Sequence, residues 1–244
     1  MKLDRVIAVR NTKTVYRDGD RAIKIFTAEY SKSDVLSEAL NHARAEETGL
    51  NIPKILGITT IDGKWAIVSE FIKGKTLSQL MQENPEIKNE YMELFVDLQM
   101  SVHQRTAPLL NKLRDKISCK LEEVELDTSV LKKLQDILEN MPNHNNICHG
   151  DFTPSNVIIT ENGTPYILDW SHATQGNALA DVACTYLLFM IADNASEAEL
   201  YLDTFCEKSD TKKHEIQKWL PVVAACKSLK ANETERCLLA NWLI

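Results

Sequence analysis

The sequence predicts an α+β protein with two lobes, a small β-rich lobe followed by a larger, mainly helical one. Short segments rich in β-branched and aromatic residues fill most of the first seventy positions. From residue 77 onward, apolar side chains recur mostly at helical spacing. A chain of 244 residues is also long enough for two lobes. We expect these lobes at residues 1–72 and 73–244, with the boundary near Lys73–Lys75.

The N-terminal lobe is expected to be a five-stranded antiparallel sheet with one helix. Asp-Gly pairs at 18–19 and 62–63 indicate hairpin turns, because glycine accepts the positive φ that such turns need. Between the third and fourth strands, apolar residues at helical spacing predict a helix that begins at a Ser33 cap and ends at Gly49. The five predicted strands are residues 5–10, 13–19, 21–26, 53–60 and 64–71.

The C-terminal lobe is expected to be helical on both sides of a short β segment. Helical periodicity extends from Leu77 to Met141 and returns from Ala178, with an interruption near Pro221. Between these stretches, the chain around the Asn162-Gly163 pair predicts a loop, a strand, a turn and a second strand.

Composition and charge exclude several classes of protein. With 28 basic against 35 acidic residues, the net charge of −7 argues against a nucleic-acid partner. The longest apolar stretch, residues 182–192, is too short to span a bilayer, and the first ten residues do not resemble a signal peptide. Six scattered cysteines without a CxxC pair are typical of a reduced, cytoplasmic protein. We expect no membrane partner, while the oligomeric state lies beyond the sequence.

The polar residues that carry chemistry are concentrated in "HGDFTPSN" and the nearby "ILDW". Asp151 precedes Asn156 by five residues, so that the first can face a substrate hydroxyl while the second binds a metal. Asp169 follows an apolar strand and offers a second hard oxygen ligand suited to Mg²⁺. Phosphoryl transfer needs mainly such positioning, metal charge and one residue that orients the attacking oxygen.

These motifs resemble the protein-kinase-like fold, in particular its aminoglycoside phosphotransferase and choline kinase branch. The pattern H-x-D-x-x-x-x-N is followed thirteen residues later by an aspartate, with HGD-x-x-P-x-N and D-W as the distinguishing variants. The resemblance extends to "IPKILG", "EFIKG", "SVHQ" in a helix and "GNALADVA". It implies an enzyme that transfers the γ-phosphate of ATP, or of GTP, to a hydroxyl of a small molecule with Mg²⁺. The acceptor would be aminoglycoside-like, or another amino alcohol or sugar.

The resemblance also implies roles for individual residues. Asp151 would accept or orient the proton of the acceptor hydroxyl, and Asn156 and Asp169 would hold Mg²⁺. Lys24 would bind the α- and β-phosphates of the nucleotide, and Glu38 on the following helix would pair with it. The alternative for Lys24 is an ordinary solvent-facing strand lysine, and two further glutamates on the same helix compete with Glu38.

The remaining implied roles are those of supporting residues. Backbone groups of Glu70, Phe71 and Ile72 would hydrogen-bond the adenine in the nucleotide-binding lobe. His149 would order the catalytic loop, and Asp181 would support that loop from the next helix, neither of them doing chemistry directly.

The first hairpin loop departs from the kinase pattern because it contains no glycine. Asn11, Thr12 and Lys13 could instead offer backbone N–H groups and a positive charge to the phosphates. The way in which this loop binds phosphate, and the choice between ATP and GTP, stay open at this point.

The acceptor is expected to be a small molecule rather than a protein. Only eleven residues separate Asp169 from Asp181, whereas a protein kinase needs a longer activation segment there. A bacterial-type protein kinase and a nucleotide-binding scaffold without catalysis remain the alternatives. An acidic band could suit a cationic acceptor, or it could be a solvated helix face. Its members are Asp193, Glu197, Glu199, Asp203, Glu207 and Asp210.

Overall fold

The computed structural model describes residues 5–10 and 12–243, which form two compact units. The first unit comprises the chain up to Leu80 together with Ser155–His172. The second comprises Met81–Pro154 and the chain from Ala173 onward. The return of residues 155–172 to the first unit has no signal in the sequence. The division into functional lobes at 1–72 and 73–244 stays a prediction.

The first unit contains the predicted five-stranded antiparallel sheet. Its strand order is β1-β2-β3-β5-β4, so the fifth strand, rather than the fourth, pairs with the third. At the hairpin turns Gly19 and Gly63 have positive φ values of 60° and 75°, as the Asp-Gly pairs predicted. The strands are β1 (Arg5–Arg10), β2 (Lys13–Asp18), β3 (Arg21–Phe26), β4 (Ile55–Ile61) and β5 (Lys64–Glu70).

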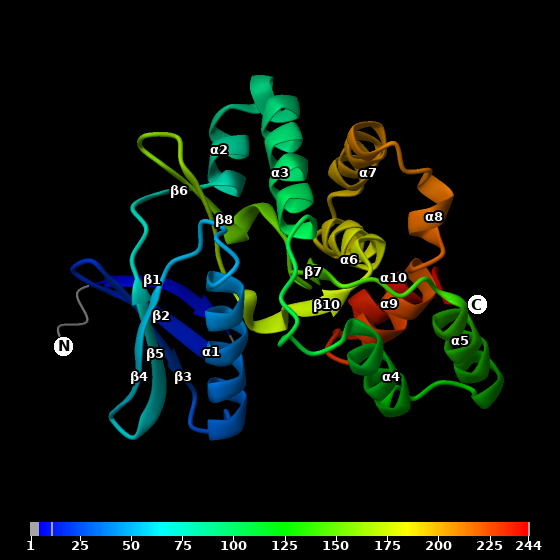
Figure 1. Cartoon of the computed structure of the whole chain (residues 1–244), viewed down its shortest axis with the longest axis horizontal. Helices are drawn as coiled ribbons and strands as arrows, with labels where there is room; N and C mark the ends of the chain where they lie inside the picture. The colour runs from blue at the N-terminus through cyan, green and yellow to red at the C-terminus, as the bar shows by residue number, and fades with distance from the viewer. Residues whose placement is uncertain (1–4, 11, 244) are drawn as a thin grey trace. The chain divides into compact units, whose positions relative to one another are not determined.

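The predicted helix is α1 (Lys32–Glu46), which lies beside the sheet (Figure 1). Val35 and Ala39 of the helix pack against Phe26 and Ile67 of the strands, because residues four apart share one helix face. The helix is capped by Ser31, whose hydroxyl accepts the N–H of Asp34 at 3.1 Å. The predicted cap at Ser33 is wrong by two residues, because that serine already lies in the first turn.

A second, three-stranded sheet completes the first unit. It has the order β6-β8-β9, from β6 (Gly74–Thr76), β8 (Val157–Thr160) and β9 (Pro165–Ile167). Strands β8 and β9 and the turn at Gly163 (φ 82°) match the prediction, whereas β6 is too short and polar to be read from the sequence. The short 3-10 turn η3 (Trp170–His172) then lies against α1.

The second unit is helical, as predicted, with one small pair of strands. Helix α6 is buried along most of its length and packs against α7, α8, α9 and α10 (Figure 1). Pro221 lies in the first turn of α9, where its missing N–H leaves no helical bond unmade. The strands β7 (Asn146–Cys148) and β10 (Thr174–Gly176), which pair antiparallel, were not predicted. The helices of this unit are α3 (Lys88–His103), α4 (Leu113–Glu123), α5 (Thr128–Asn140), α6 (Ala178–Ile191), α7 (Ala195–Ser209), α8 (Lys213–Gln217), α9 (Leu220–Ser228) and α10 (Glu233–Ala240); α2 (Leu77–Glu83) crosses between the units.

Aromatic side chains form the centre of the second unit. The ring of Phe95 on α3 contacts the rings of Phe152, Phe189 and Tyr201, with centroids 4.6–5.9 Å apart. Phe152 belongs to the "HGDFTPSN" segment, so this aromatic core anchors the start of that loop. Among the described residues, each helix is too short or too polar to cross a lipid bilayer.

Candidate functional site

In the first unit, four charged side chains meet on the face of the sheet that α1 covers. The ammonium of Lys24, on β3, lies 2.6 Å from Glu38 Oε1 and 3.3 Å from Asp169 Oδ1. Lys13, the first residue of β2, places its ammonium 3.2 Å from Asp169 Oδ2 and 3.7 Å from Glu38 Oε1. Lys24 is therefore not a free surface lysine, and its partner on the helix is Glu38, as predicted from the motif. We call Lys13, Lys24, Glu38 and Asp169 the charge cluster.

The local fold explains why these four residues meet. Glu38 shares with Val35 and Ala39 the face of α1 that packs on the sheet, and only 6% of its surface is exposed. Lys24 pairs across the sheet with Ile67 of β5, in the part of the sheet that this helix covers. Asp169 follows β9 by two residues and has a φ of 57°, a left-handed conformation that aspartate tolerates better than bulkier residues.

Electrostatics hold Lys24 and Asp169 in their charged forms. Burial alone would lower the pKa of Lys24, but the charges of Asp169 and Glu38 raise it above its ordinary value. Burial alone would raise the pKa of Asp169, yet Lys24 and Lys13 hold it well below its usual range. At neutral pH the cluster thus offers two ammonium groups and a carboxylate to a ligand.

Asn156 and Asp169 lie at the open end of one hairpin. Val157 of β8 pairs with Ile167 of β9, and the N–H of Leu168 donates to the carbonyl of Asn156 at 2.8 Å. These bonds hold the residue before Asp169 against Asn156, so the two predicted metal ligands are neighbours in the first unit.

The donor set suits Mg²⁺ better than a transition metal. The described residues contain no cluster of three His, Cys, Asp or Glu side chains able to hold a metal on its own. One carboxylate and one amide oxygen match Mg²⁺, which is commonly bound by one or two carboxylates together with waters and substrate phosphates. Lys13 and Lys24 place cationic groups at Asp169, and its role as a metal ligand stays a prediction.

The predicted adenine-binding segment follows β5 directly. The backbone N–H of Glu70 donates to Lys54 O, and that of Phe71 donates to Asp20 O, both at 2.9 Å. The ring of Phe71 lies under the guanidinium of Arg17, at 4.4 Å. A base bound here would therefore use the carbonyl groups of this segment or the N–H of Ile72. Asn11, the other loop residue proposed for phosphate binding, lies outside the described residues.

In the second unit, Asp181 supports the loop that carries Asp151. The carboxylate of Asp181, at the start of α6, accepts the backbone N–H of Gly150 at 2.7 Å. His149 is fully buried, its ring is in edge contact with Phe152, and its Nδ1 accepts the N–H of Asp151 at 3.2 Å. Burial alone would raise the pKa of Asp181, but hydrogen bonds from His103 and Gly150 lower it. These contacts tie His149 and Asp181 to the Gly150–Asp151 segment, and their supporting roles stay a prediction.

A buried polar network behind this loop was missed by the sequence analysis. Asp181 Oδ2 also accepts hydrogen bonds from His103 Nε2 at 2.9 Å and from Gln99 Nε2 at 3.3 Å. Gln99 in turn donates to the hydroxyl of Thr185, and that hydroxyl donates to Phe152 O. The side-chain oxygen of Gln99 accepts a hydrogen bond from the hydroxyl of Tyr201. The only sequence signal was His103 in "SVHQ", because isolated Gln, Thr and Tyr in apolar helices carry no recognisable pattern.

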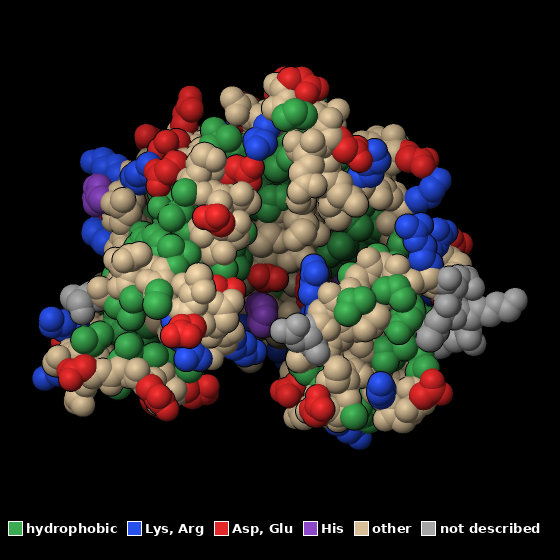
Figure 2. Space-filling model, turned by 180° about the vertical axis from the view of Figure 1, so that it is seen from behind, with side chains coloured by type: hydrophobic (Ala, Val, Ile, Leu, Met, Phe, Trp, Pro, Cys, Tyr) green, Lys and Arg blue, Asp and Glu red, His purple; other side chains and the backbone are tan. Residues whose placement is uncertain are grey.

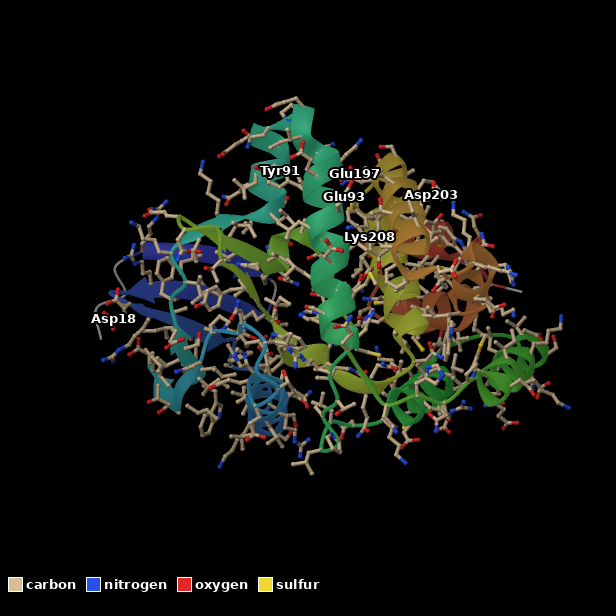
Figure 3. All side chains as sticks on the ribbon, turned by 45° about the horizontal axis from the view of Figure 1, so that its top comes forward. Asp18, Tyr91, Glu93, Glu197, Asp203 and Lys208 are labelled. Carbon is tan, nitrogen blue, oxygen red and sulfur yellow. The ribbon has the colours of Figure 1, made fainter. Side chains whose placement is uncertain are left out.

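Three of the six residues of the acidic band pair with lysines of their own unit. Figure 3 shows Glu197, Asp203 and Lys208 on α7, with Tyr91 and Glu93 on α3. Ion pairs join Lys88 to Glu197, Lys208 to Asp97, and Lys213 to both Glu199 and Asp203, at 2.7–2.9 Å. Figure 2 likewise shows acidic and basic side chains interspersed over the face that it displays. This arrangement favours the solvated helix face over a site for a cationic acceptor.

Comparison with known proteins agrees with the motifs and the fold. A model of the phosphotransferase enzyme family matches residues 7–218. Aminoglycoside phosphotransferase APH(4)-Ia, in a complex with ADP and hygromycin B, has a TM-score of 0.69 at 16% identity, covering 98% of this chain and 90% of that one. Choline kinase LicA from Streptococcus pneumoniae has a TM-score of 0.65 at 14% identity, covering 98% and 93%.

A curated relative adds sequence similarity over part of its length. A probable serine/threonine-protein kinase, PknB, from Lactococcus lactis subsp. lactis is 25% identical over 172 residues. The match covers 68% of this chain and 21% of the relative, so it concerns about a fifth of that protein. The family match covers most of the chain, on the fold that the motifs predicted. This chain therefore belongs to the phosphotransferase enzyme family.

Proposed function

We propose that the protein transfers the γ-phosphoryl group of ATP, or of GTP, to a hydroxyl of a small molecule, with Mg²⁺. The observation that carries this proposal is the ammonium of Lys24, held between Glu38 at 2.6 Å and Asp169 at 3.3 Å. A buried strand lysine fixed by a helix glutamate is arranged to bind nucleotide phosphates. The family match and the ADP in the APH(4)-Ia complex support the same nucleotide class.

In this proposal the charge cluster binds the nucleotide phosphates. Lys24 contacts the α- and β-phosphates, and Glu38 keeps its ammonium in place. Lys13 supplies a second ammonium. It takes the place of the backbone N–H groups that a glycine-rich hairpin loop would offer to the phosphates. Glu70, Phe71 and Ile72 bind the base through their backbone.

Asn156 and Asp169 hold the Mg²⁺, which neutralises phosphate charge when it is bound. Their side chains belong to one hairpin end, so binding requires no large rearrangement of the first unit. The lowered pKa of Asp169 keeps this carboxylate ionised across the physiological pH range.

Asp151 orients the acceptor hydroxyl and accepts its proton. The hydroxyl oxygen forms a bond to the γ-phosphorus, the bond from that phosphorus to the β–γ bridging oxygen breaks, and the nucleoside diphosphate leaves. The proton passes from Asp151 to solvent. His149 and Asp181 keep the Gly150–Asp151 peptide in place for this step.

The acceptor is a small molecule in this proposal. The eleven residues after Asp169 form η3, β10 and the start of α6, so regular elements occupy the place of an activation segment. The similarity to PknB favours a protein kinase as the second candidate. That candidate predicts transfer to a protein serine or threonine, which the same assay can detect.

The experiment measures nucleoside diphosphate release with Mg-ATP or Mg-GTP and a panel of acceptors. The panel contains aminoglycosides, choline, sugars, homoserine, nucleosides and a generic protein substrate. We expect one small-molecule acceptor to stimulate release by the wild type and not by Asp151→Asn. If no acceptor raises turnover above that of the variant, the protein is a scaffold without catalysis. A thermal shift with Mg-ATP is the first measurement, and the lack of any stabilisation would contradict nucleotide binding.

A further inference from the structure

Four lysines of the second unit gather where helix α4 meets helix α9. Lys116 and Lys120 are four residues apart on α4 and share one face of that helix. Lys227 lies in the last turn of α9, and Lys230 follows three residues later. The two helices are in contact, and the thiol of Cys226 on α9 reaches Ile117 O on α4 at 3.9 Å. We call these four lysines the lysine cluster.

The lysine cluster reaches the peptide that carries the proposed base. The ammonium of Lys227 lies 3.5 Å from the carbonyl oxygen of Gly150, the residue directly before Asp151. The thiol of Cys184 on α6 donates to the same carbonyl at 3.3 Å. Asp151 also acts on Lys227 at a distance, since its charge contributes to raising the pKa of that lysine against the effect of burial. Lys227 is therefore a cation close to the place where an acceptor hydroxyl would react.

The electrostatics of the cluster differ from those of the lysines around the acidic band. Burial lowers the pKa of Lys116 to about 8, and the charges of Lys120, Lys227 and Lys230 add to this lowering. Burial and the charges of Lys227 and Lys230 also lower the pKa of Lys120. Neighbouring carboxylates, in contrast, raise the pKa values of Lys208 and Lys213 around the acidic band. Partly desolvated ammonium groups that repel one another create a positive potential, which an anion would relieve.

We propose that the lysine cluster binds an anionic group, a carboxylate or a phosphate, on the acceptor whose hydroxyl faces Asp151. This inference rests on the proposed function and narrows its acceptor. A polycationic aminoglycoside or choline would place positive charge beside these lysines. Half of the acidic band offers little compensation, because Glu197, Glu199 and Asp203 already pair with Lys88 and Lys213.

The test compares small hydroxyl compounds that carry a negative, zero or positive charge. Calorimetry measures binding of glycerate, glycerol phosphate, glycerol and choline to Asp151→Asn, which separates binding from turnover. Release of nucleoside diphosphate from Mg-ATP or Mg-GTP in the presence of the same compounds measures transfer by the wild type. Lys120→Met removes one charge of the cluster without touching Gly150. The matched control is Lys132→Met on the exposed face of α5.

We expect glycerate or glycerol phosphate to bind more tightly than glycerol and choline, and to be the better acceptor. Lys120→Met should weaken binding of the anion about tenfold, the effect of losing one charged contact, and Lys132→Met should not. Comparing the affinities of glycerate and glycerol phosphate shows whether the cluster prefers a carboxylate or a phosphate. Equal or better binding and transfer with glycerol or choline would overturn the anionic acceptor and leave the phosphotransferase intact. Absence of transfer to every acceptor, with the anions still bound in a Lys120-dependent way, would overturn the proposed function alone.

Discussion

Replacing Asp181 by asparagine tests how the catalytic loop is held. One carboxylate oxygen accepts the N–H of Gly150, and the other accepts bonds from His103 Nε2 and Gln99 Nε2. A carboxamide has a single acceptor oxygen. If that oxygen faces the N–H of Gly150, the new NH₂ group faces the donors of His103 and Gln99. If the oxygen faces His103 and Gln99 instead, the NH₂ group faces the N–H of Gly150.

Both orientations leave at least one buried donor without an acceptor. His103 can adapt only by moving its proton to Nδ1, which is buried and has no hydrogen-bond partner in the described part of the chain. Gln99 can adapt only by giving up its bond with Tyr201. Each orphaned buried donor costs about 1–3 kcal/mol, and the remaining bonds lose their charge assistance. We expect the free energy of unfolding to fall by about 2–4 kcal/mol.

Urea unfolding at several pH values measures this loss. The folded-state pKa of Asp181 is lowered from the ordinary 3.8, so its charged form stabilises the fold above pH 3.8 and this contribution is lost as the pH falls further. The difference between wild type and Asp181→Asn should thus be full at pH 6 and should shrink below pH 4. Asp203→Asn, the same change at a carboxylate that is 67% exposed, is the matched control and should cost at most about 1 kcal/mol.

Asp181→Asn should also lower kcat about tenfold to a hundredfold at 25 °C, where this variant remains folded, because the Gly150–Asp151 peptide shifts. Equal unfolding free energies of wild type and Asp181→Asn at pH 6 would refute the buried network. A loss of stability with unchanged kcat would refute the positioning of Asp151 through Gly150.

Two further predictions concern the charge cluster and the packing of β10. Lys24→Met should abolish Mg-ATP binding in calorimetry, because Lys24 is the ammonium that Glu38 holds at 2.6 Å for the phosphates. Lys13→Met should weaken this binding about tenfold, because Lys24 remains at Asp169; unchanged affinity in Lys13→Met would remove Lys13 from phosphate binding. Gly176→Ala should lower the free energy of unfolding by about 1–3 kcal/mol in a urea titration, because the added Cβ would lie 2.5 Å from Leu113 Cβ; an unchanged midpoint would show that the α4 backbone yields at no cost.

Local patterns determined the elements of the first unit but not how they pair. Alternating strands, Asp-Gly turns and a helical stripe are short-range signals, and they predicted α1 and each strand of the five-stranded sheet with small errors at the ends. The order β3-β5-β4 depends on which edges meet across the sheet, and no local pattern records that choice. The three-residue strands β6, β7 and β10 were not predicted from the sequence, because three residues are too few to show a periodicity.

The sequence by itself determined the family and the candidate site residues, because Lys24, Asp151, Asn156 and Asp169 stand at characteristic spacings in the chain. Only the tertiary structure showed the ion pairs that Lys13 makes with Asp169 and Glu38, the buried network behind Gly150, and the lysines at the junction of α4 and α9. It also showed that Glu197, Glu199 and Asp203 of the acidic band pair with lysines. The physical reason is that charges act through space over a few ångströms, whereas the residues that supply them lie up to 156 positions apart in the chain.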